Sequence, residues 1–174
     1  RGGGTGTNGQ SLTSGVVVDL SRHMNKVLEV NPKEGWVKVQ AGVVKDKLND
    51  ILRPQGYFFS PDLSTSNRAT LGGMINTDAS GQGSLVYGKT SDHILGLKTV
   101  LLDGHVLDSG PVSLEQAESI ARQDNRIARI YRQVIDTCVG EETHIREKFP
   151  PLNRFLTGYD LKHAYDPGDQ KIDV

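Results

Sequence analysis

Glycine at the start of the chain restricts the fold more than any other sequence feature. Five of the first nine residues are glycine, in the segment RGGGTGTNGQ. Glycine loses more conformational freedom on folding than any other residue and supplies no side chain to a core. A segment of this composition therefore favours neither a helix nor a core strand. It is typical of a turn whose backbone approaches a ligand closely.

The spacing of these glycines matches Gly-x-Gly-x-x-Gly at Gly4, Gly6 and Gly9. In a Rossmann fold such glycines lead directly into a helix whose amino end faces a pyrophosphate. Here the β-branched run at 16–18 follows after six residues, which leaves no room for that helix and predicts a strand over 16–19. A P-loop is excluded because no Gly-Lys-Ser/Thr follows.

What remains is a glycine-rich turn between extended segments. It presents a row of backbone N–H groups beside the polar side chains of Arg1, Thr5, Asn8 and Ser11. Successive amides in such a turn form a concave anion site. The segment therefore predicts a phosphate or pyrophosphate site, with a flexible loop that holds no ligand as the alternative.

Composition excludes several classes of protein. The net charge is −1 and the pI about 6.6, so there is no basic field for nucleic acid. No apolar run approaches the roughly 20 residues of a membrane-spanning helix, and no signal peptide is visible. The single cysteine, Cys138, excludes an internal disulfide and a Cys-x-x-Cys site. We expect a cytoplasmic protein whose 174 residues form one domain or two small lobes.

The histidines are scattered rather than spaced as metal ligands. We predict no metal site and interpret each histidine as an ordinary surface or hairpin residue. No residue has the setting of a general base, so we assign no catalytic residue. The histidines are His23, His93, His105, His144 and His163.

Strand and helix signals alternate in the next part of the chain. Alternating hydrophobicity predicts strands at 27–31 and 35–41, joined by the turn residues 32–35. Apolar residues at helical spacing predict a helix over 44–52, which Pro54 ends. This mixture indicates an α+β fold.

A long polar segment occupies residues 60–92 and surrounds a short apolar helix near Leu71 and Met74. Compact domains usually keep segments of this kind for function. The pair Gly72-Gly73 permits a backbone to approach a flat or extended ligand. A surface loop without a ligand is the alternative.

A hairpin is predicted over 93–109, where two apolar runs flank the Asp103-Gly104 turn. Lys98 is expected to face water. Leu97, Val100 and Leu102 are expected to contribute to the core.

Residues 110–155 carry helix signals. Ser113 and Gln116 have the spacing of a capping box, Asp124-Asn125 interrupts the helical pattern, Gly140 stops it, and a short charged helix ends at Pro150. We expect either a lid or a pair of packing helices, with a role in substrate gating as the alternative; Cys138 is interpreted as a small core residue. One apolar face is formed by Ile120, Ile127, Tyr131, Val134 and Cys138.

Three motifs occur in order: RGGGTG, then PDLS with ATLGGM and ASG, then YGKTSDHILGLKTVLLDGHVLD. Together they resemble the FAD-binding domain of vanillyl-alcohol-oxidase or PCMH-type flavoproteins. Within that family the chain is similar to the D-2-hydroxy-acid dehydrogenases, which include D-lactate dehydrogenase, glycolate oxidase and the large bacterial D-2-hydroxyglutarate dehydrogenases with iron–sulfur modules. The resemblance covers residues 1–109 and resumes with LTGYDLKHAY at 156–165.

The resemblance implies an α+β, PCMH-type fold with a mixed or antiparallel sheet flanked by helices. It implies a domain core at 1–109, a helical insertion at 110–155 and a truncated return segment at 156–174. Because the chain begins inside the glycine segment and ends in DPGDQKIDV, we expect a fragment of a longer protein. Such a fragment is expected to be inactive alone and to hold FAD poorly.

The resemblance also implies that the arginine–glycine loop holds the FAD pyrophosphate through backbone amides. Relatives that attach the flavin covalently through this loop carry a histidine there, and this chain has none, so we expect FAD to be bound non-covalently. The residues that the resemblance assigns to the cofactor are Arg1, Gly2, Gly3, Gly4, Thr5, Gly6, Asn8, Pro61, Asp62, Thr70, Gly72, Gly73, Asn76, Ala79, Ser80, Gly81, Tyr87 and Gly88.

The implied activity is oxidation of a D-2-hydroxy acid, namely 2-hydroxyglutarate, lactate or glycolate, to the 2-oxo acid. Electrons would pass from the flavin to a quinone, a carrier protein or an iron–sulfur cluster carried elsewhere in the protein. The implied location is the cytoplasm or the periphery of the inner membrane. Two alternatives are an NADPH-dependent enzyme like UDP-N-acetylenolpyruvoylglucosamine reductase, and a nucleotide-binding module without catalysis.

Overall fold

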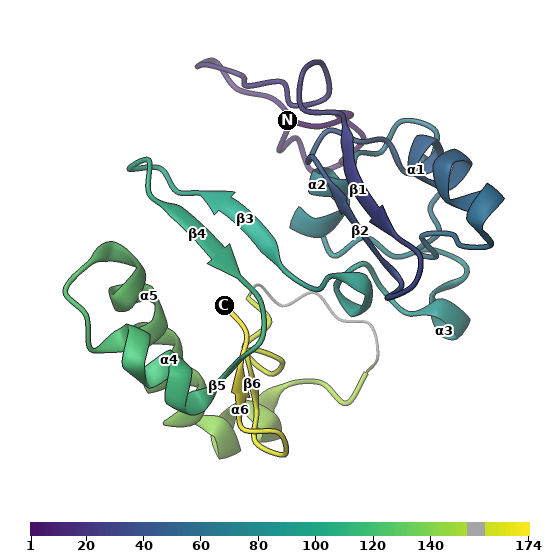
Figure 1. The fold of residues 1–174 in the computed structure, drawn as a ribbon. Coiled ribbons are helices and arrows are strands. Elements are labelled where there is room, and N and C mark those ends of the chain that lie inside the picture. Colours follow the sequence, from purple (N-terminus) through teal and green to yellow (C-terminus); the bar gives the residue numbers. More distant parts are fainter. Residues whose placement is uncertain (153–158) are drawn as a thin grey trace. The chain divides into compact units, whose positions relative to one another are not determined.

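The computed structural model describes residues 1–152 and 159–174 (Figure 1). The first part of the return motif, 156–158, lies outside the described residues. The chain divides into two compact units, Arg1–His93 and Ile94–Val174. Each unit has its own hydrophobic core.

The first unit is built on an antiparallel hairpin that packs against a helix (Figure 1). Buried Val43, Leu48, Leu52 and Leu71 form its core together with half-buried valines of the hairpin. Its elements are β1 (Val27–Asn31), β2 (Trp36–Val39), α1 (Lys45–Leu52), η1 (Arg53–Gln55), α2 (Leu71–Asn76), α3 (Ser84–Tyr87) and η2 (Ser91–His93).

Most of the predicted elements of this unit are confirmed. The strands at 27–31 and 35–41 correspond to β1 and β2, with Val30 opposite Val37. The helix predicted over 44–52 is α1, and the short apolar helix is α2. Alternating hydrophobicity predicted β2 correctly, because one face of a hairpin meets the core and the other meets water.

The strand predicted over 16–19 is wrong. These residues form no strand, and Val16 and Val18 are 90% and 65% exposed. The segment is held at its end instead, where Leu20 N donates to Arg1 O at 2.9 Å. A β-branched run becomes a strand only when a neighbouring strand accepts its ladder of hydrogen bonds, and the described residues place none there.

The second unit combines two small antiparallel sheets with a helical region (Figure 1). One sheet is the hairpin β3–β4, and the other has the strand order β5-β7-β6. Its elements are β3 (Leu97–Val100), β4 (Val106–Ser109), β5 (Val112–Ser113), α4 (Leu114–Ala121), α5 (Arg126–Val134), η3 (Ile135–Val139), α6 (Glu142–Lys148), β6 (Tyr165–Asp166) and β7 (Lys171–Ile172).

The hairpin β3–β4 forms as predicted, but the core role predicted for its leucines and valine is wrong. Leu97 is 36% exposed, Val100 is 70% exposed and Leu102 is fully exposed. Only Leu107 of this hairpin is buried in the core. Val100 is exposed because a two-stranded ribbon packs on one face, and the Lys98–Asp108 and Val100–Val106 pairs point to the other. Leu102 lies in the connection between the strands, and Leu97 is on the same face as Leu107 but at the end of the ribbon.

The helical region follows the sequence signals closely. Ser113 and Gln116 form a complete capping box, with both hydrogen bonds at 3.2 Å. Asn125 begins α5 by accepting a hydrogen bond from Ala128 N at 2.8 Å. Cys138 is 2% exposed in the core, as predicted, and burial raises the pKa of its thiol.

The α+β class is confirmed, with helices and small antiparallel sheets in both units. None of the helices in the described part of the chain has the length and hydrophobicity needed to cross a membrane.

Candidate functional site

The glycine loop, residues 1–7, lies directly against the segment that leads into α2. A Cβ atom at Gly2 would collide with Thr70 Oγ1, and one at Gly3 would collide with the backbone oxygen of Arg68. The glycine loop and the polar segment 60–92 are therefore in contact. Glycine is required at both positions because backbone and buried side chain occupy the space of a Cβ.

The backbone amides of this loop are available to a ligand. Within residues 1–152 and 159–174, the N–H groups of residues 2–7 donate to no protein acceptor. Asn8 N, by contrast, donates to Gln10 Oε1 at 3.0 Å, and Leu12 N donates to Gly9 O at 2.9 Å. Six successive free donors in a largely exposed glycine-rich loop are the chemistry that a phosphate or pyrophosphate requires.

The amino end of α2 has a different role, because the protein itself uses its donors. Leu71 N donates to Val43 O and Gly72 N donates to Ala41 O, both at 2.8 Å. Gly73 N donates to the capping hydroxyl of Thr70 at 3.4 Å. The first turn of α2 therefore holds residues 68–70 in place. We call these residues the 68–70 platform, because the glycine loop lies against them.

The turn after α2, which includes Gly81, packs against Asp62 in the PDLS segment that precedes the 68–70 platform. A Cβ atom at Gly81 would collide with the backbone oxygen of Asp62. Gly81 N donates to Ser84 Oγ at 2.8 Å, and this hydroxyl donates to Gly81 O at 2.6 Å. The PDLS and ASG motifs are thereby brought together, as a common site requires.

Buried Lys89 and half-buried Asp78 form an ion pair at the base of the same turn. Lys89 Nζ lies 2.6 Å from Asp78 Oδ2, and the Lys89 side chain is 8% exposed. Ser91 N donates to Asp78 Oδ1 at 3.0 Å. Burial works to raise the pKa of Asp78, but the hydrogen bonds from Lys89 and Ser91 outweigh it and hold this pKa below its ordinary range.

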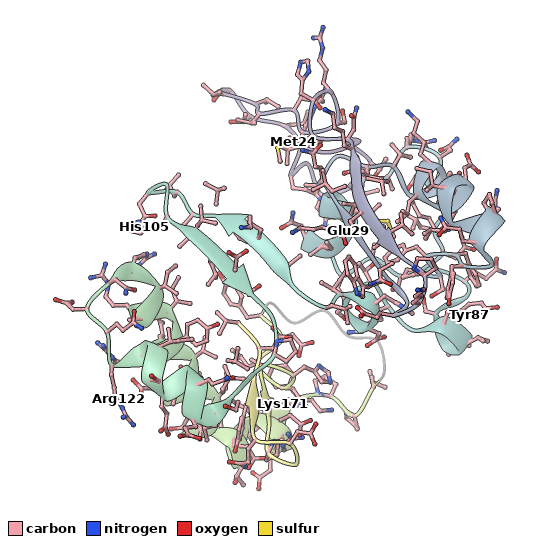
Figure 2. All side chains as sticks on the ribbon, in the orientation of Figure 1. Met24, Glu29, Tyr87, His105, Arg122 and Lys171 are labelled. Carbon is pink, nitrogen blue, oxygen red and sulfur yellow. The ribbon has the colours of Figure 1, made fainter. Side chains whose placement is uncertain are left out.

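An open cleft of about 560 Å³ lies between α1 and α3. Phe58 and Tyr87 meet edge to face in it, with ring centroids 5.6 Å apart, and Figure 2 labels Tyr87. Lys45 Nζ is buried and lies 3.6 Å from Asp62 Oδ1. The cleft is lined by Lys45, Asn49, Arg53, Gly56, Tyr57, Phe58, Ser60, Asp62, Gly83 and Tyr87.

Sequence reasoning missed two features of this cleft. Lys45 was assigned no role, and no sequence signal marks it, because lysine is usually exposed and only the fold brings it to Asp62. Phe58 was also missed, although it belongs to the aromatic run YFF just before Pro61. Of the predicted cofactor residues, Asp62 and Tyr87 line the cleft.

His93 is exposed, as expected for a surface histidine, but it also connects two of the predicted cofactor segments. Its Nε2 lies 3.0 Å from Ser60 Oγ and 2.6 Å from Tyr87 O. Because a carbonyl oxygen only accepts, Nε2 carries the proton. The ring therefore ties the end of α3 to the residue before Pro61, a role that the sequence did not indicate.

All predicted cofactor residues lie in the first unit. Pro61 and Thr70 are buried, whereas Asn76 is exposed and donates to Gly72 O at 2.8 Å. Arg1 Nε pairs with Asp19 Oδ2 at 3.3 Å. Among the described residues, no group of three or more His, Cys, Asp and Glu is placed to hold a metal ion.

A bare glycine loop with free amides, seated on a capped helix, fits the pyrophosphate of a dinucleotide without a Rossmann helix. Residues 1–110 match the FAD binding domain family, and the chain belongs to this family of flavoprotein domains. The predicted cofactor, FAD, is thereby confirmed as the ligand class of the domain.

The relatives are more specific. Over its whole length the chain is 60% identical to D-2-hydroxyglutarate dehydrogenase of Escherichia coli (strain K12), and 63% identical to the protein of that name from Pantoea ananatis (strain AJ13355). It spans 17% of the length of each. Over 110 residues, 62% of this chain, it is 36% identical to glycolate oxidase subunit GlcD of Bacillus subtilis (strain 168) and spans 23% of that protein.

Proposed function

We propose that this chain is the cofactor-binding part of a flavin-dependent dehydrogenase that oxidises a D-2-hydroxy acid to a 2-oxo acid. D-2-hydroxyglutarate is the substrate we favour, because the relatives with that name match the chain along its entire length. Lactate and glycolate are the other candidates. Bound FAD supplies the hydride acceptor, and the protein binds and orients it.

The single observation that carries this proposal is the row of free amides at residues 2–7, which lies against the 68–70 platform. These amides hold the pyrophosphate, with the side chains of Thr5 and Asn8 beside them. Segments 61–62, 70–81 and 87–88 line the rest of the cofactor. We assign no residue to proton abstraction.

The same proposal covers the organisation and partners of the protein. Residues 1–109 form the core of the FAD domain, 110–155 a helical insertion and 156–174 its return segment. Electrons leave the flavin for an iron–sulfur centre, a quinone or a carrier protein. The protein works in the cytoplasm or at the surface of the inner membrane, and no described helix could span that membrane.

The test is anaerobic reduction of the flavin in the native protein that contains this chain. Bleaching of the visible band by D-2-hydroxyglutarate, but not by its L-enantiomer, is expected; D-lactate and glycolate decide the breadth of the substrate class. Bleaching by NADPH alone would indicate a reductase instead. A purified protein without flavin that also binds none on titration would indicate a different nucleotide ligand.

Non-covalent attachment is tested on the same preparation. Residues 1–10 contain no histidine or cysteine that could form a flavin link. Acid precipitation of the holoprotein should therefore leave the yellow colour in the supernatant. A yellow pellet would contradict the expectation.

A further inference from the structure

We propose that Asp78 and Lys89 are positioning residues for FAD: their ion pair closes the neck of the loop 79–88 and fixes the segment 79–81 against the cofactor. This inference rests on the proposed function, since the cofactor contact of residues 79–81 belongs to it. The contacts at the neck carry the argument, and neither residue was assigned to the site from the sequence.

The neck of the loop is held by four contacts between two short segments. The ion pair joins Asp78 Oδ2 to Lys89 Nζ at 2.6 Å, and Ser91 N donates to Asp78 Oδ1 at 3.0 Å. Thr90 donates twice to the backbone oxygen of Ala79, from N at 3.1 Å and from Oγ1 at 2.6 Å. Residues 78–79 and 89–91 therefore close the loop much as the paired ends close an Ω-loop.

Lys89 and Thr90 of the neck are buried and Asp78 is half-buried, whereas the tip of the loop is exposed. Lys89 and Thr90 are 7% and 0% exposed, but Leu85 and Val86 at the tip are 95% and 79% exposed. The far end of the loop is held separately, where the Tyr87 ring contacts Phe58 and the Tyr87 carbonyl oxygen accepts from His93 Nε2. Residues 79–81 lie next to the neck, so the contacts of the neck and the contact of Gly81 with Asp62 fix their conformation.

Asp78 also holds an unusual backbone conformation, with φ at +42°. Asparagine and aspartate adopt this left-handed region more readily than other side-chain-bearing residues. It redirects the chain at the end of α2 so that Ala79 N donates back to Met74 O at 2.8 Å. The ion pair thus stabilises a turn that would otherwise be costly, at the point where the proposed cofactor segment begins.

The Lys89 side chain is buried, whereas that of Asp78 is partly exposed. Removing Asp78 leaves the buried ammonium group of Lys89 without compensation, and removing Lys89 leaves the half-buried carboxylate of Asp78 without its partner; both cost more than loss of a fully exposed pair. This cost becomes smaller if the loop opens and water solvates the remaining charge. Opening moves residues 79–81, so the cost appears in the affinity for FAD.

The experiment uses the native protein with Lys89→Met, Asp78→Asn and Lys89→Arg. Asparagine in place of Asp78 keeps the preference for the left-handed conformation and the acceptor for Ser91 N, and arginine in place of Lys89 keeps the positive charge. Lys98→Met is the matched control, because Lys98 also pairs with an aspartate, Asp108, at 3.1 Å, but on an exposed hairpin. Measurements are the FAD dissociation constant by fluorescence titration of apoprotein, the shape of the bound flavin absorption band, and Tm without FAD.

Lys89→Met and Asp78→Asn are expected to raise the dissociation constant by about tenfold or more and to alter the flavin band. Lys89→Arg should restore most of the affinity, and Lys98→Met should stay within about twofold of the native protein. A role in stability alone would lower Tm and leave the affinity and band unchanged at temperatures well below Tm, which would overturn the inference.

If Lys89→Met does not fold, Asp78→Asn decides alone, and an affinity equal to that of the Lys98→Met control overturns the inference. If the native protein binds FAD and both Lys89→Met and Asp78→Asn bind it with the same affinity, the positioning role is refuted and the proposed function stands. Native protein that binds no FAD refutes both.

Discussion

At the scale of single residues, the candidate site depends on glycines that lie so close to neighbouring atoms that no Cβ fits. Gly2 and Gly3 press against Thr70 and Arg68, and Gly81 presses against Asp62. These contacts explain why small residues recur in both polar segments. A side chain at Gly2 or Gly3 would displace the glycine loop, whose amides we propose as the ligand site.

Gly3→Ala is therefore expected to weaken FAD binding by about tenfold or more, because a Cβ collides with Arg68 O and moves the amides of the glycine loop. Gly35→Ala is the control. Gly35 lies in the β1–β2 turn with φ at +74° and open space around it, so alanine there adds strain of about 1 kcal/mol or more without touching the loop. Isothermal titration of apoprotein with FAD measures both. Equal affinities for the two variants would contradict the pyrophosphate assignment.

A second prediction at this scale concerns Asp78 and the dependence of the free energy of unfolding on pH. Its pKa in the folded protein lies below the ordinary value of 3.8, so the unfolded chain binds this proton first. The stabilisation is present above pH 3.8 and is lost as pH falls through the folded pKa. Over the range from roughly pH 5 to 3, the free energy of unfolding should fall more steeply in the native protein than in Asp78→Asn. Urea unfolding across that range checks this, and parallel curves would rule it out.

At the scale of elements, the helices of the second unit begin at capping residues that lie next to them in the sequence. The Ser113–Gln116 capping box begins α4, and Asn125 begins α5. These helices pack through Ala117, Ala121 and Tyr131 into the core that also holds Ile172 of β7. The Ser113 cap of α4 therefore stabilises a core to which residues from the start and the end of the second unit contribute.

Ser113→Ala should destabilise the protein by about 1 kcal/mol, because α4 loses the acceptor for Gln116 N. Thr143→Ala in α6 is the control, since Thr143 is exposed and its hydroxyl caps no helix end and lies 3.5 Å from the carboxylate of its neighbour Glu142. Denaturant unfolding followed by far-UV circular dichroism measures the difference. The same midpoint for both variants would show that the capping box contributes nothing.

At the scale of the whole molecule, the chain is a small part of what its relatives contain. It spans 17% of the length of the D-2-hydroxyglutarate dehydrogenases that it matches. The first unit alone holds every predicted cofactor residue, and large apolar side chains such as Leu85, Leu102 and Val16 are exposed in the two units. A cofactor that further segments help to enclose is bound more weakly without them, since those segments supply contacts and order the loops beforehand.

Residues 1–174 expressed alone should therefore bind FAD at least about a hundredfold more weakly than the native protein, a difference of roughly 2.8 kcal/mol. They should also oxidise no 2-hydroxy acid. Titration of FAD fluorescence and reduction of an artificial electron acceptor test the two statements. Submicromolar binding, or any turnover by residues 1–174, would contradict this prediction.

The sequence by itself determined what depends on near neighbours. The β1–β2 and β3–β4 hairpins, α1 and the α4 capping box all follow from residues a few positions apart, because turn geometry and helix caps are local interactions. The pyrophosphate role of the glycine loop stays a prediction. The resemblance of the ordered motifs added the cofactor. The tertiary structure alone decided what depends on distant partners. Val16–Val18 lack a strand to pair with, and Val100 faces water because only the other face of its ribbon meets a core. His93 joins Ser60 to Tyr87, and Asp78 finds Lys89, only because folding brings separate segments within hydrogen-bond distance, and burial then strengthens the contact between Asp78 and Lys89.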